Sequence, residues 1–225
     1  MLQFLNSHSM TPAAAALKPR KSPVQARSTA TVEALHTATI QVLTREGLSR
    51  CTTTRVAQRA GMSVGSLYQY YPNRDALLAA VLAKHLDGIA SAVEHTCREH
   101  RGGPVSAMAA ALVAAFLAAK LRDPGESKAL YAVAGERGGA ELVARVHARM
   151  EAEITAMLES AADARFDDAA ATAAIALNAL VGPVRAVLEG NVPPGFEARL
   201  EGQLALLLGA YLQASRIPRR EHARR

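Results

Sequence analysis

The stretch that decides the fold runs from Thr53 to Tyr70 and reads TTRVAQRAGMSVGSLYQY. Apolar residues recur at helical spacing on both sides of Gly61, which predicts two short helices joined by a glycine turn. Ser63 stands where the N-cap of the second helix belongs. Ala57, the glycine and Leu67 have the spacing of a helix-turn-helix, because a small side chain lets the second helix cross closely and the leucine locks the pair.

The outward positions of the second predicted helix carry small or hydrogen-bonding side chains, which suit a helix lying in the major groove of DNA. Ser63 belongs to this predicted DNA-binding set as the cap. We predict that the residues facing the groove are Thr54, Val64, Gly65, Ser66 and Gln69. Three hydroxyls and one cation would bind phosphates and position the helix without reading bases. These predicted phosphate anchors are Thr53, Tyr68, Tyr70 and Arg74. The alternative interpretation is a helical hairpin inside an all-α core.

The residues around the motif extend the pattern. A helical segment ends at Gly47, then come TT-x-x-x-A-x-x-x-G and S-x-x-x-L-Y-x-x-Y-P-N-R-x-x-L-L. This order resembles the N-terminal domain of the TetR family of transcriptional regulators over roughly Arg27 to Val81. Tyr70 stands where a histidine is frequent and Arg74 where a lysine is usual, and both keep a donor for phosphate. The resemblance implies a sequence-specific regulator that binds a palindromic operator as a homodimer, with repression by a ligand-responsive dimer as the favoured mode.

Composition favours helices throughout. Of the 225 residues, 50% are apolar and only 4% are aromatic, so alanine, leucine and valine must build the core. Such a core favours closely packed helices over sheets. The sequence predicts an all-α fold, with an N-terminal three-helix helix-turn-helix DNA-binding domain followed by a larger helical ligand-binding and dimerisation domain. No alternation persists long enough to predict a strand.

Positive charge gathers in the N-terminal third and at both ends, while residues 76–215 are mildly acidic and the net charge is +6. This division fits double-stranded DNA as the partner of the N-terminal third. We expect a disordered basic arm at 1–23, the DNA-binding domain at 24–72, the regulatory and dimerisation domain at 73–216, and a basic tail at 217–225. The arm could instead reflect a start codon placed too early, with Met10 as the second candidate.

The sequence shows no sign of export or of a membrane partner. The first residues lack the basic start and unbroken apolar run of a signal peptide. The longest apolar run, Val105 to Ala119, is short and rich in alanine. Two cysteines, Cys51 and Cys97, have no CxxC spacing, which favours a reducing compartment. We therefore expect a cytoplasmic protein.

Helical spacing and breakers predict the remaining elements. The first helix should run from Val24 or Ser28 to Glu46, and a long helix should begin after Asn73 and end by Gly102. A turn is expected over residues 163–168. The other predicted helices cover residues 105–121, 126–134, 140–162, 167–189 and 196–215.

The last two predicted helices carry wide apolar stripes. The TetR resemblance implies that these helices form a four-helix bundle across a homodimer, whereas the sequence alone leaves a core within one chain as the alternative. The predicted dimer residues are Leu177, Val181, Val184, Leu188, Leu204, Leu208 and Tyr211.

Asn178 and Arg185 share one face of an otherwise apolar helix. A buried amide and guanidinium would hold the polar groups of an unidentified small-molecule effector. The alternative is an interface salt bridge between Arg185 and Glu189, which lie four residues apart. The predicted ligand residues are Phe116, Tyr131, His147, Asn178 and Arg185.

Two clusters suggest other chemistry. Near the end of the long helix, His95 and Glu99 share a face, but Cys97 points away and no second pair completes a metal site. His100 lies three residues after Cys97 and belongs to the same cluster. Separately, Cys51 is expected in an exposed link, where its thiol could be chemically modified. A metal- or thiol-responsive sensor and an interaction module without DNA binding are therefore alternatives. We predict no bound metal or cofactor, and no enzyme, since G-x-S-x-G, P-loop and H-E-x-x-H motifs are absent from the sequence.

Overall fold

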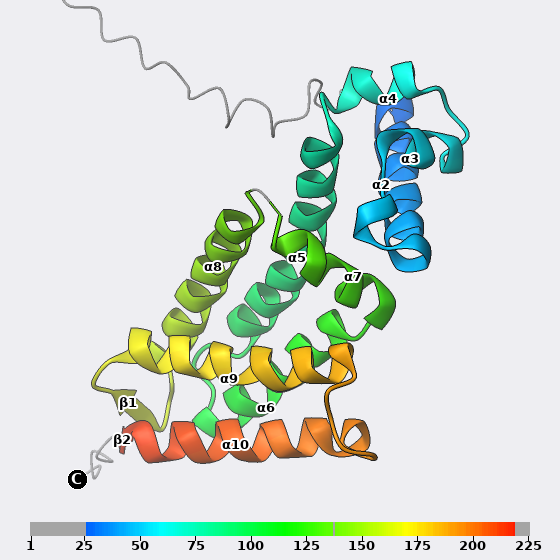
Figure 1. Cartoon of the computed structure of the whole chain (residues 1–225). Coiled ribbons are helices and arrows are strands. Elements are labelled where there is room, and N and C mark those ends of the chain that lie inside the picture. The colour runs from blue at the N-terminus through cyan, green and yellow to red at the C-terminus, as the bar shows by residue number, and fades with distance from the viewer. Residues whose placement is uncertain (1–25, 137, 219–225) are drawn as a thin grey trace, which may run out of the picture. The chain divides into compact units, whose positions relative to one another are not determined.

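The computed structural model describes residues 26–136 and 138–218; the arm predicted at 1–23 and most of the tail predicted at 217–225 lie outside them. Within these ranges the regular elements are helices apart from two three-residue strands, which confirms the all-α prediction (Figure 1). The chain divides into two compact units. The first holds the residues up to Ala83 together with Ala132–Ala140, and the second holds Lys84–Tyr131 and the residues from Glu141 onward.

The first unit contains the helix-turn-helix. Its elements are α2 (Ala26–Glu46), the 3-10 turn η1 (Leu48–Arg50), α3 (Thr53–Arg59), α4 (Val64–Tyr70) and the first turns of α5 (Arg74–Glu99). Each of these α-helices contributes fully buried side chains to a common core, among them Leu35, Val56, Leu67 and Leu77. Because both units share α5, a functional boundary after residue 72 stays a prediction.

The second unit holds the rest of α5 and five further helices, two of which extend into the first unit at residues 132–134 and 139–140. These are α6 (Val105–Lys120), α7 (Pro124–Ala134), α8 (Gly139–Glu159), α9 (Ala169–Glu189) and α10 (Leu200–Ser215). Helix α10 packs against both α6 and α9, and Figure 1 shows α9 and α10 side by side. Phe116 of α6 and Ile154 of α8 are among the largest side chains buried in the core of this unit.

The expectation of no strands was wrong. Strand β1 (Ala164–Phe166) pairs antiparallel with β2 (Arg216–Pro218), with Arg165 opposite Ile217. An ion pair of 3.2 Å between Arg216 and Asp163 lies beside this ribbon. Strands of three residues are too short to show alternation, and each needs a partner distant in sequence, so the pattern at 163–168 indicated only a turn.

Three helices begin at residues other than those predicted, for three different local reasons. Helix α7 begins at Pro124 rather than at residue 126, since proline is well tolerated in the first helical turn. Helix α9 begins at Ala169, where the Asp168 carboxylate accepts a hydrogen bond from the Ala171 amide at 2.8 Å. Residues 197–199 form a 3-10 turn, so α10 begins at Leu200 rather than at residue 196.

Within the described residues, α6 and α7 together meet the length and composition of a membrane span as a pair bent by 85°, and two single helices meet them alone. These are α5 and α9, and 50% and 39% of their apolar windows are buried inside the protein. Their apolar positions thus serve, in large part, the cores described above. The expectation of no membrane partner stays a prediction.

Candidate functional site

Capping side chains and a glycine fix the turn between α3 and α4. The Thr52 hydroxyl accepts a hydrogen bond from the Arg55 amide at 3.3 Å and caps α3. The Ser63 hydroxyl accepts one from the Ser66 amide at 3.0 Å and caps α4. Gly61 has a φ of +69°, a left-handed conformation that other residues rarely adopt. The predicted cap at Ser63 and the glycine turn are confirmed.

Three buried side chains hold α3 against α4. Val56, Ala57 and Leu67 are fully shielded from solvent, and the Met62 amide donates to the Ala57 carbonyl at 3.0 Å. Because Ala57 has only a methyl group, the two helices can approach closely. The pair presents the other face of α4 to solvent.

The outer face of α4 is open. Gly65, Tyr68 and Gln69 are exposed, with Tyr68 at 40%. A Cβ atom on Gly65 would meet nothing closer than Ser63 Oγ at 3.7 Å. The rest of the predicted groove set comprises Thr54, which is exposed, and Val64 and Ser66, which are half-buried. A small and polar exposed face fits the major groove.

Two predicted phosphate anchors come together at the base of this face. Thr53 Oγ1 and the Tyr68 hydroxyl lie 3.2 Å apart and link the start of α3 to α4. Tyr70, a third predicted anchor, is half-buried at the end of α4. Adjacent hydroxyls can donate to one phosphate and position the helix without reading bases. Their contact with DNA stays a prediction.

Arg74, the fourth predicted anchor, is engaged within the protein. Its Nε donates to the Cys51 carbonyl at 2.7 Å, and its Nη2 donates to the Leu48 carbonyl at 2.8 Å. The carboxylates of Asp75 and Glu136 lie 3.7 and 3.8 Å from Nη1. The guanidinium therefore fastens the link between α2 and α3 to the start of α5, a structural role that the sequence pattern did not indicate.

Exposed arginines near the motif were missed. Arg59 donates to the Gln41 side chain at 2.6 Å, and Arg55 pairs with Glu46. The excess of positive charge over residues 24–75 was the available signal, but it does not say which side chains point outward. Among the first-unit residues whose burial is described, the exposed arginines are Arg45, Arg50, Arg55 and Arg59.

Family models match two parts of the chain. The model described as bacterial regulatory proteins of the tetR family matches residues 35–81. The model described as a tetracyclin repressor-like C-terminal domain matches residues 104–212. The chain belongs to the TetR family of transcriptional regulators. It is therefore a DNA-binding transcription regulator, as the motif predicted, and a non-enzymatic one by family.

Solved structures share this TetR fold at low identity. SmeT of Stenotrophomonas maltophilia, the repressor of the multidrug efflux pump SmeDEF, is 19% identical with a TM-score of 0.64 over 83% of this chain and 90% of its own. The fatty acid degradation regulator FadR of Bacillus halodurans is 14% identical with a TM-score of 0.61 over 79% and 97%. A regulatory protein of the tetR family from Rhodococcus RHA1 is 16% identical, with a TM-score of 0.62 over 82% and 96%. No curated protein matches the sequence.

Both cysteines of this TetR protein are buried, which corrects the expectation of an exposed Cys51. Burial raises the pKa of the Cys51 thiol to about 11, against an opposing effect of Arg74. Burial, together with the Glu153 carboxylate, raises the pKa of Cys97 to about 12. Since the thiolate is the reactive form, neither environment favours a thiol sensor.

Both thiols should therefore react slowly in the folded protein. At pH 8, we expect labelling by a disulfide reagent at least ~10-fold slower than for the same protein unfolded in urea, because burial restricts both access and ionisation. The rate of absorbance change on labelling measures this. Native labelling as fast as in urea would show that one cysteine is accessible after all.

The histidine and cysteine cluster does not form a metal site. His95 and Glu99 lie 3.3 Å apart on the surface of α5, while Cys97 is buried on another face. In the described ranges, no group of three or more histidine, cysteine or acidic residues could hold a metal ion. The metal-sensor alternative therefore has no support from these side chains.

The predicted ligand residues separate into two groups. Asn178 and Arg185 are exposed on α9, where the amide donates to the Ala174 carbonyl at 2.8 Å and Arg185 pairs with Glu189 at 2.7 Å. The ion pair between Arg185 and Glu189 matches the alternative interpretation. The amide and guanidinium are exposed and are not the buried ligand-binding groups that the sequence suggested. The other three predicted ligand residues lie inside or half inside the second unit, namely Phe116, Tyr131 and His147.

One residue beside this second group was missed. Lys120 of α6 is 7% exposed, and its ammonium group lies 4.3 Å from the centre of the Tyr131 ring. Its position after the alanine-rich run of α6 resembles an ordinary helix-ending lysine, which suits the negative end of the helix dipole. Nothing in the sequence pattern therefore placed it in the interior.

Most predicted dimer residues are part of the core of their own chain. Val181 and Tyr211 are half-buried against this core, and the others are buried in it, namely Leu177, Val184, Leu188, Leu204 and Leu208. This was the alternative left open by the sequence. The exposed apolar residues of these helices are instead Ile175 of α9 and Leu206 and Leu207 of α10, at 53%, 66% and 49%.

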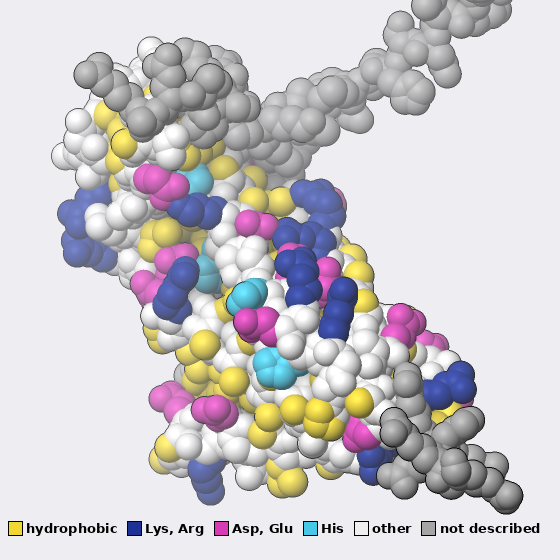
Figure 2. All heavy atoms as spheres, turned by 180° about the vertical axis from the view of Figure 1, so that it is seen from behind, with side chains coloured by type: hydrophobic (Ala, Val, Ile, Leu, Met, Phe, Trp, Pro, Cys, Tyr) yellow, Lys and Arg dark blue, Asp and Glu magenta, His cyan; other side chains and the backbone are white. Residues whose placement is uncertain are grey.

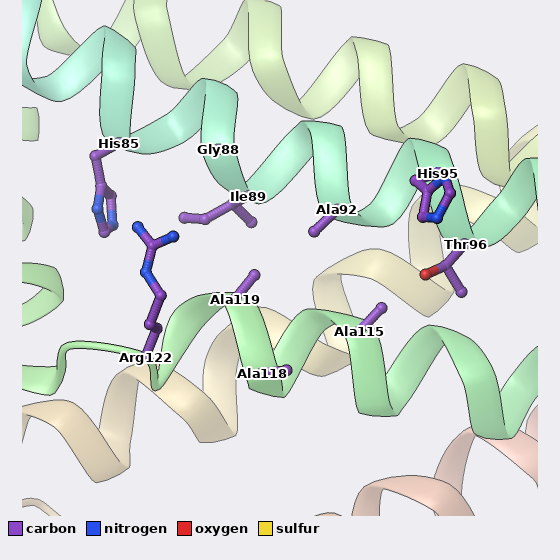
Figure 3. Close-up of a pocket in the computed structure, with 10 residues that line it drawn as sticks. All are labelled: His85, Gly88, Ile89, Ala92, His95, Thr96, Ala115, Ala118, Ala119 and Arg122. Atoms are coloured by element: carbon purple, nitrogen blue, oxygen red, sulfur yellow. The ribbon is translucent and has the colours of Figure 1, made fainter.

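An open hollow of about 340 Å³ lies between α5 and α6 (Figure 3). Small and apolar side chains such as Ile89 and Ala119 line it, and His85 and Arg122 face each other at one end. Nδ1 of His85 lies 2.9 Å from the Glu126 carboxylate. Both histidines of the lining, His85 and His95, already have carboxylate partners, so the lining does not single out one ligand.

Charges of both signs mix on the face shown in Figure 2. Lysine and arginine side chains lie among aspartate and glutamate there, rather than in one basic stripe. In the second unit, Arg149 pairs with Asp87 and Glu94 at 2.7 and 2.8 Å. Exposed pairs of this kind add little stability.

Proposed function

We propose that the protein is a cytoplasmic, ligand-responsive transcriptional repressor that binds a palindromic operator as a homodimer. The observation that carries the proposal is the open outer face of α4, with Gly65, Tyr68 and Gln69 exposed on a locked helix-turn-helix. SmeT, which shares the fold, is named as the repressor of an efflux pump, and FadR as a regulator of fatty acid degradation. A bound dimer represses wherever its site overlaps a promoter.

The two-fold operator follows from the size of the motif. One recognition helix reads only a few base pairs, so specific affinity requires two copies. We propose residues 24–72 as the DNA-binding domain and 73–216 as the dimerisation and ligand-binding domain. The basic arm and tail would add phosphate contacts. Affinity measured on DNA fragments of different lengths and at different salt concentrations tests this.

The outer faces of α9 and α10 support the dimer. On α9, exposed residues recur at helical spacing, and Gly182 is open to close approach, since a Cβ atom added there would meet nothing within 4 Å. On α10, Leu206 and Leu207 add apolar surface. Small residues and leucines on adjacent helices suit packing against a two-fold related copy. We therefore propose Ile175, Asn178, Gly182, Arg185, Leu206 and Leu207 as interface residues.

Fluorescence anisotropy tests the function directly. Fragments selected from genomic DNA should bind far more tightly than random duplexes, and log affinity should fall linearly with log salt concentration. Equal affinity for selected and random fragments at every salt concentration would contradict sequence-specific binding.

Gln69→Ala and Tyr68→Phe should differ in kind. Losing the Gln69 amide should cost about 1–3 kcal/mol on the best operator only, because glutamine can pair with adenine. Losing the Tyr68 hydroxyl should weaken operator and random DNA by a similar small factor, because a phosphate contact carries no sequence information. Anisotropy with both DNAs measures the two ratios, and the same loss for both variants on both DNAs would refute this division.

A further inference from the structure

Lys120 is a buried cation without a matching anion. The residue is 7% exposed, and burial lowers the pKa of its ammonium group to about 8. Among residues 26–136 and 138–218, no aspartate or glutamate forms an ion pair with it. Lysines are almost never buried in this way unless they are paired, so this position suits an anion from outside the chain.

Among the described residues, the groups that contact this ammonium group or feel its charge supply no anion. The Tyr131 ring of α7 lies 4.3 Å away, and Arg185 of α9 lies 5.2 Å from the same ring. The pKa values of His147 of α8 and His85 of α5 are lowered by burial and further by the Lys120 charge. A lowered pKa favours the neutral imidazole near pH 7, so neither histidine supplies a charge that could balance Lys120.

The nearby carboxylates are engaged with other groups. Glu189 pairs with Arg185 at 2.7 Å, and Glu126 lies 2.9 Å from His85. Glu151, on α8, acts on the pKa of His147. None of the three neutralises Lys120, so the charge imbalance is local to the ammonium group.

Tyr131 adds an independent sign of a missing partner. Its hydroxyl is buried and has no hydrogen-bond partner among residues 26–136 and 138–218, which is costly for a group that can both donate and accept. The Tyr131 and His147 side chains are half-buried, so both remain partly open to solvent. Phe116, one helical turn before Lys120, is buried and extends the apolar surface on that side of α6.

We propose that Lys120 and Tyr131 bind the carboxylate of a small apolar acid. The ammonium group pairs with the carboxylate, the tyrosine hydroxyl donates to one of its oxygens, and the apolar part lies against the core of the second unit. Charge-assisted hydrogen bonds of this kind are among the strongest available to a buried site. The regulatory meaning of the site rests on the proposed ligand response, whereas carboxylate binding itself does not.

Butanoate, octanoate and dodecanoate are suitable probes, with the matching alcohols as uncharged controls. Calorimetry should show binding of at least one carboxylate, with affinity at least ~30-fold above that of its alcohol, because the alcohol leaves the ammonium group unpaired. Binding should take up a proton at pH 8.5, since the carboxylate restores the charged form of Lys120. Two buffers of different ionisation enthalpy measure this uptake.

Lys120→Met keeps the bulk and removes the charge. It should abolish the proton uptake and weaken the carboxylate by at least ~30-fold, while Tyr131→Phe should weaken it by roughly 5- to 10-fold. Lys128→Met, at an exposed lysine of α7, is the matched control and should change neither quantity. Failure of all three carboxylates to bind, or binding that Lys120→Met leaves intact, would overturn the proposal.

Thermal denaturation without ligand gives a second readout. The folded protein releases the Lys120 proton at a pKa of about 8, but the unfolded chain holds it up to the ordinary lysine value of 10.5. The charge penalty is thus complete below pH 8 and disappears between pH 8 and 10.5. Lys120→Met should melt higher than wild type at pH 7, with the gap narrowing over that window; a gap independent of pH would contradict a buried charge.

Carboxylate binding at Lys120 and its effect on DNA binding can be tested separately. Lys120-dependent carboxylate binding that leaves operator affinity unchanged would support the anion site and refute the ligand response. Loss of sequence-specific DNA binding in the free protein would refute the proposed function without touching the site. Equal effects of carboxylate and alcohol on operator affinity would count against the site itself.

Discussion

Leu206→Glu combined with Leu207→Glu should convert the protein to a monomer and lower its operator affinity by about 10²- to 10⁴-fold. The two leucines are exposed at 66% and 49% within one chain, so their replacement leaves the core of that chain intact. In a dimer the glutamates would be buried opposite their own copies. Like charges without partners are strongly unfavourable there.

The affinity loss follows from the geometry of a two-fold site. In a dimer, binding of the first recognition helix holds the second near its half-site at a high effective concentration. A monomer loses this advantage and retains mainly the binding of one half-site. Sedimentation velocity measures the mass, and anisotropy with the operator and with a single half-site measures the affinity.

Ala148→Glu combined with Ala152→Glu is the matched control. Both alanines are exposed on α8 and lie four residues apart, so the charge change is the same on another face of the same unit. The control should stay dimeric and keep its operator affinity. A dimeric Leu206 and Leu207 variant with unchanged mass would show that the interface lies elsewhere.

The helix-turn-helix could be predicted because its determinants are local. Ala57, Gly61 and Ser63 act through a small volume, a left-handed backbone and a cap, and each effect depends on residues within one turn. Their spacing therefore determines the order of the helices and the outward face of α4. The same reasoning does not extend to Arg74, whose partners at Leu48 and Cys51 are distant in sequence.

The apolar residues of α9 and α10 show a limit of helical periodicity, which cannot tell a core face from an interface. A helix in a bundle has an apolar face toward its own core, and a second apolar face is needed for an interface. Leu204 and Leu208 form the first kind on α10, while Leu206 and Leu207 form the second. Both kinds look alike in a run of leucines, so only the packing against α6 and α9 tells them apart.

Lys120 illustrates a different limit. A lysine at the end of an apolar helix is normally solvated, and nothing in its neighbours along the chain indicates burial. Its environment is made by Tyr131 on α7 and by His147 on α8, which come to it through tertiary packing. The two neighbours could be named as candidates from the sequence, but no signal there pointed to the cation between them.

Arg74→Ala should destabilise the protein by roughly 2–4 kcal/mol, because two hydrogen bonds from a charged group to backbone carbonyls are lost. The carbonyls of Leu48 and Cys51 would lose their partners as the link between α2 and α3 loosens. Urea unfolding followed by circular dichroism measures the free energy of unfolding. Arg59→Ala, at an exposed arginine with one side-chain partner, is the control and should cost under about 1 kcal/mol.

Thiol labelling separates this structural role from a purely electrostatic one. Arg74 lowers the pKa of Cys51 against the larger effect of burial, so removing its charge alone should slow labelling of Cys51. Loosening of the link should instead expose Cys51 and accelerate its labelling, while Cys97, in the other unit, serves as the internal control.

If Arg74 were only a phosphate anchor, Arg74→Ala would leave stability unchanged and reduce the salt slope of DNA binding by about one. Faster labelling of Cys51 together with lower stability is the result expected from the contacts at Leu48 and Cys51.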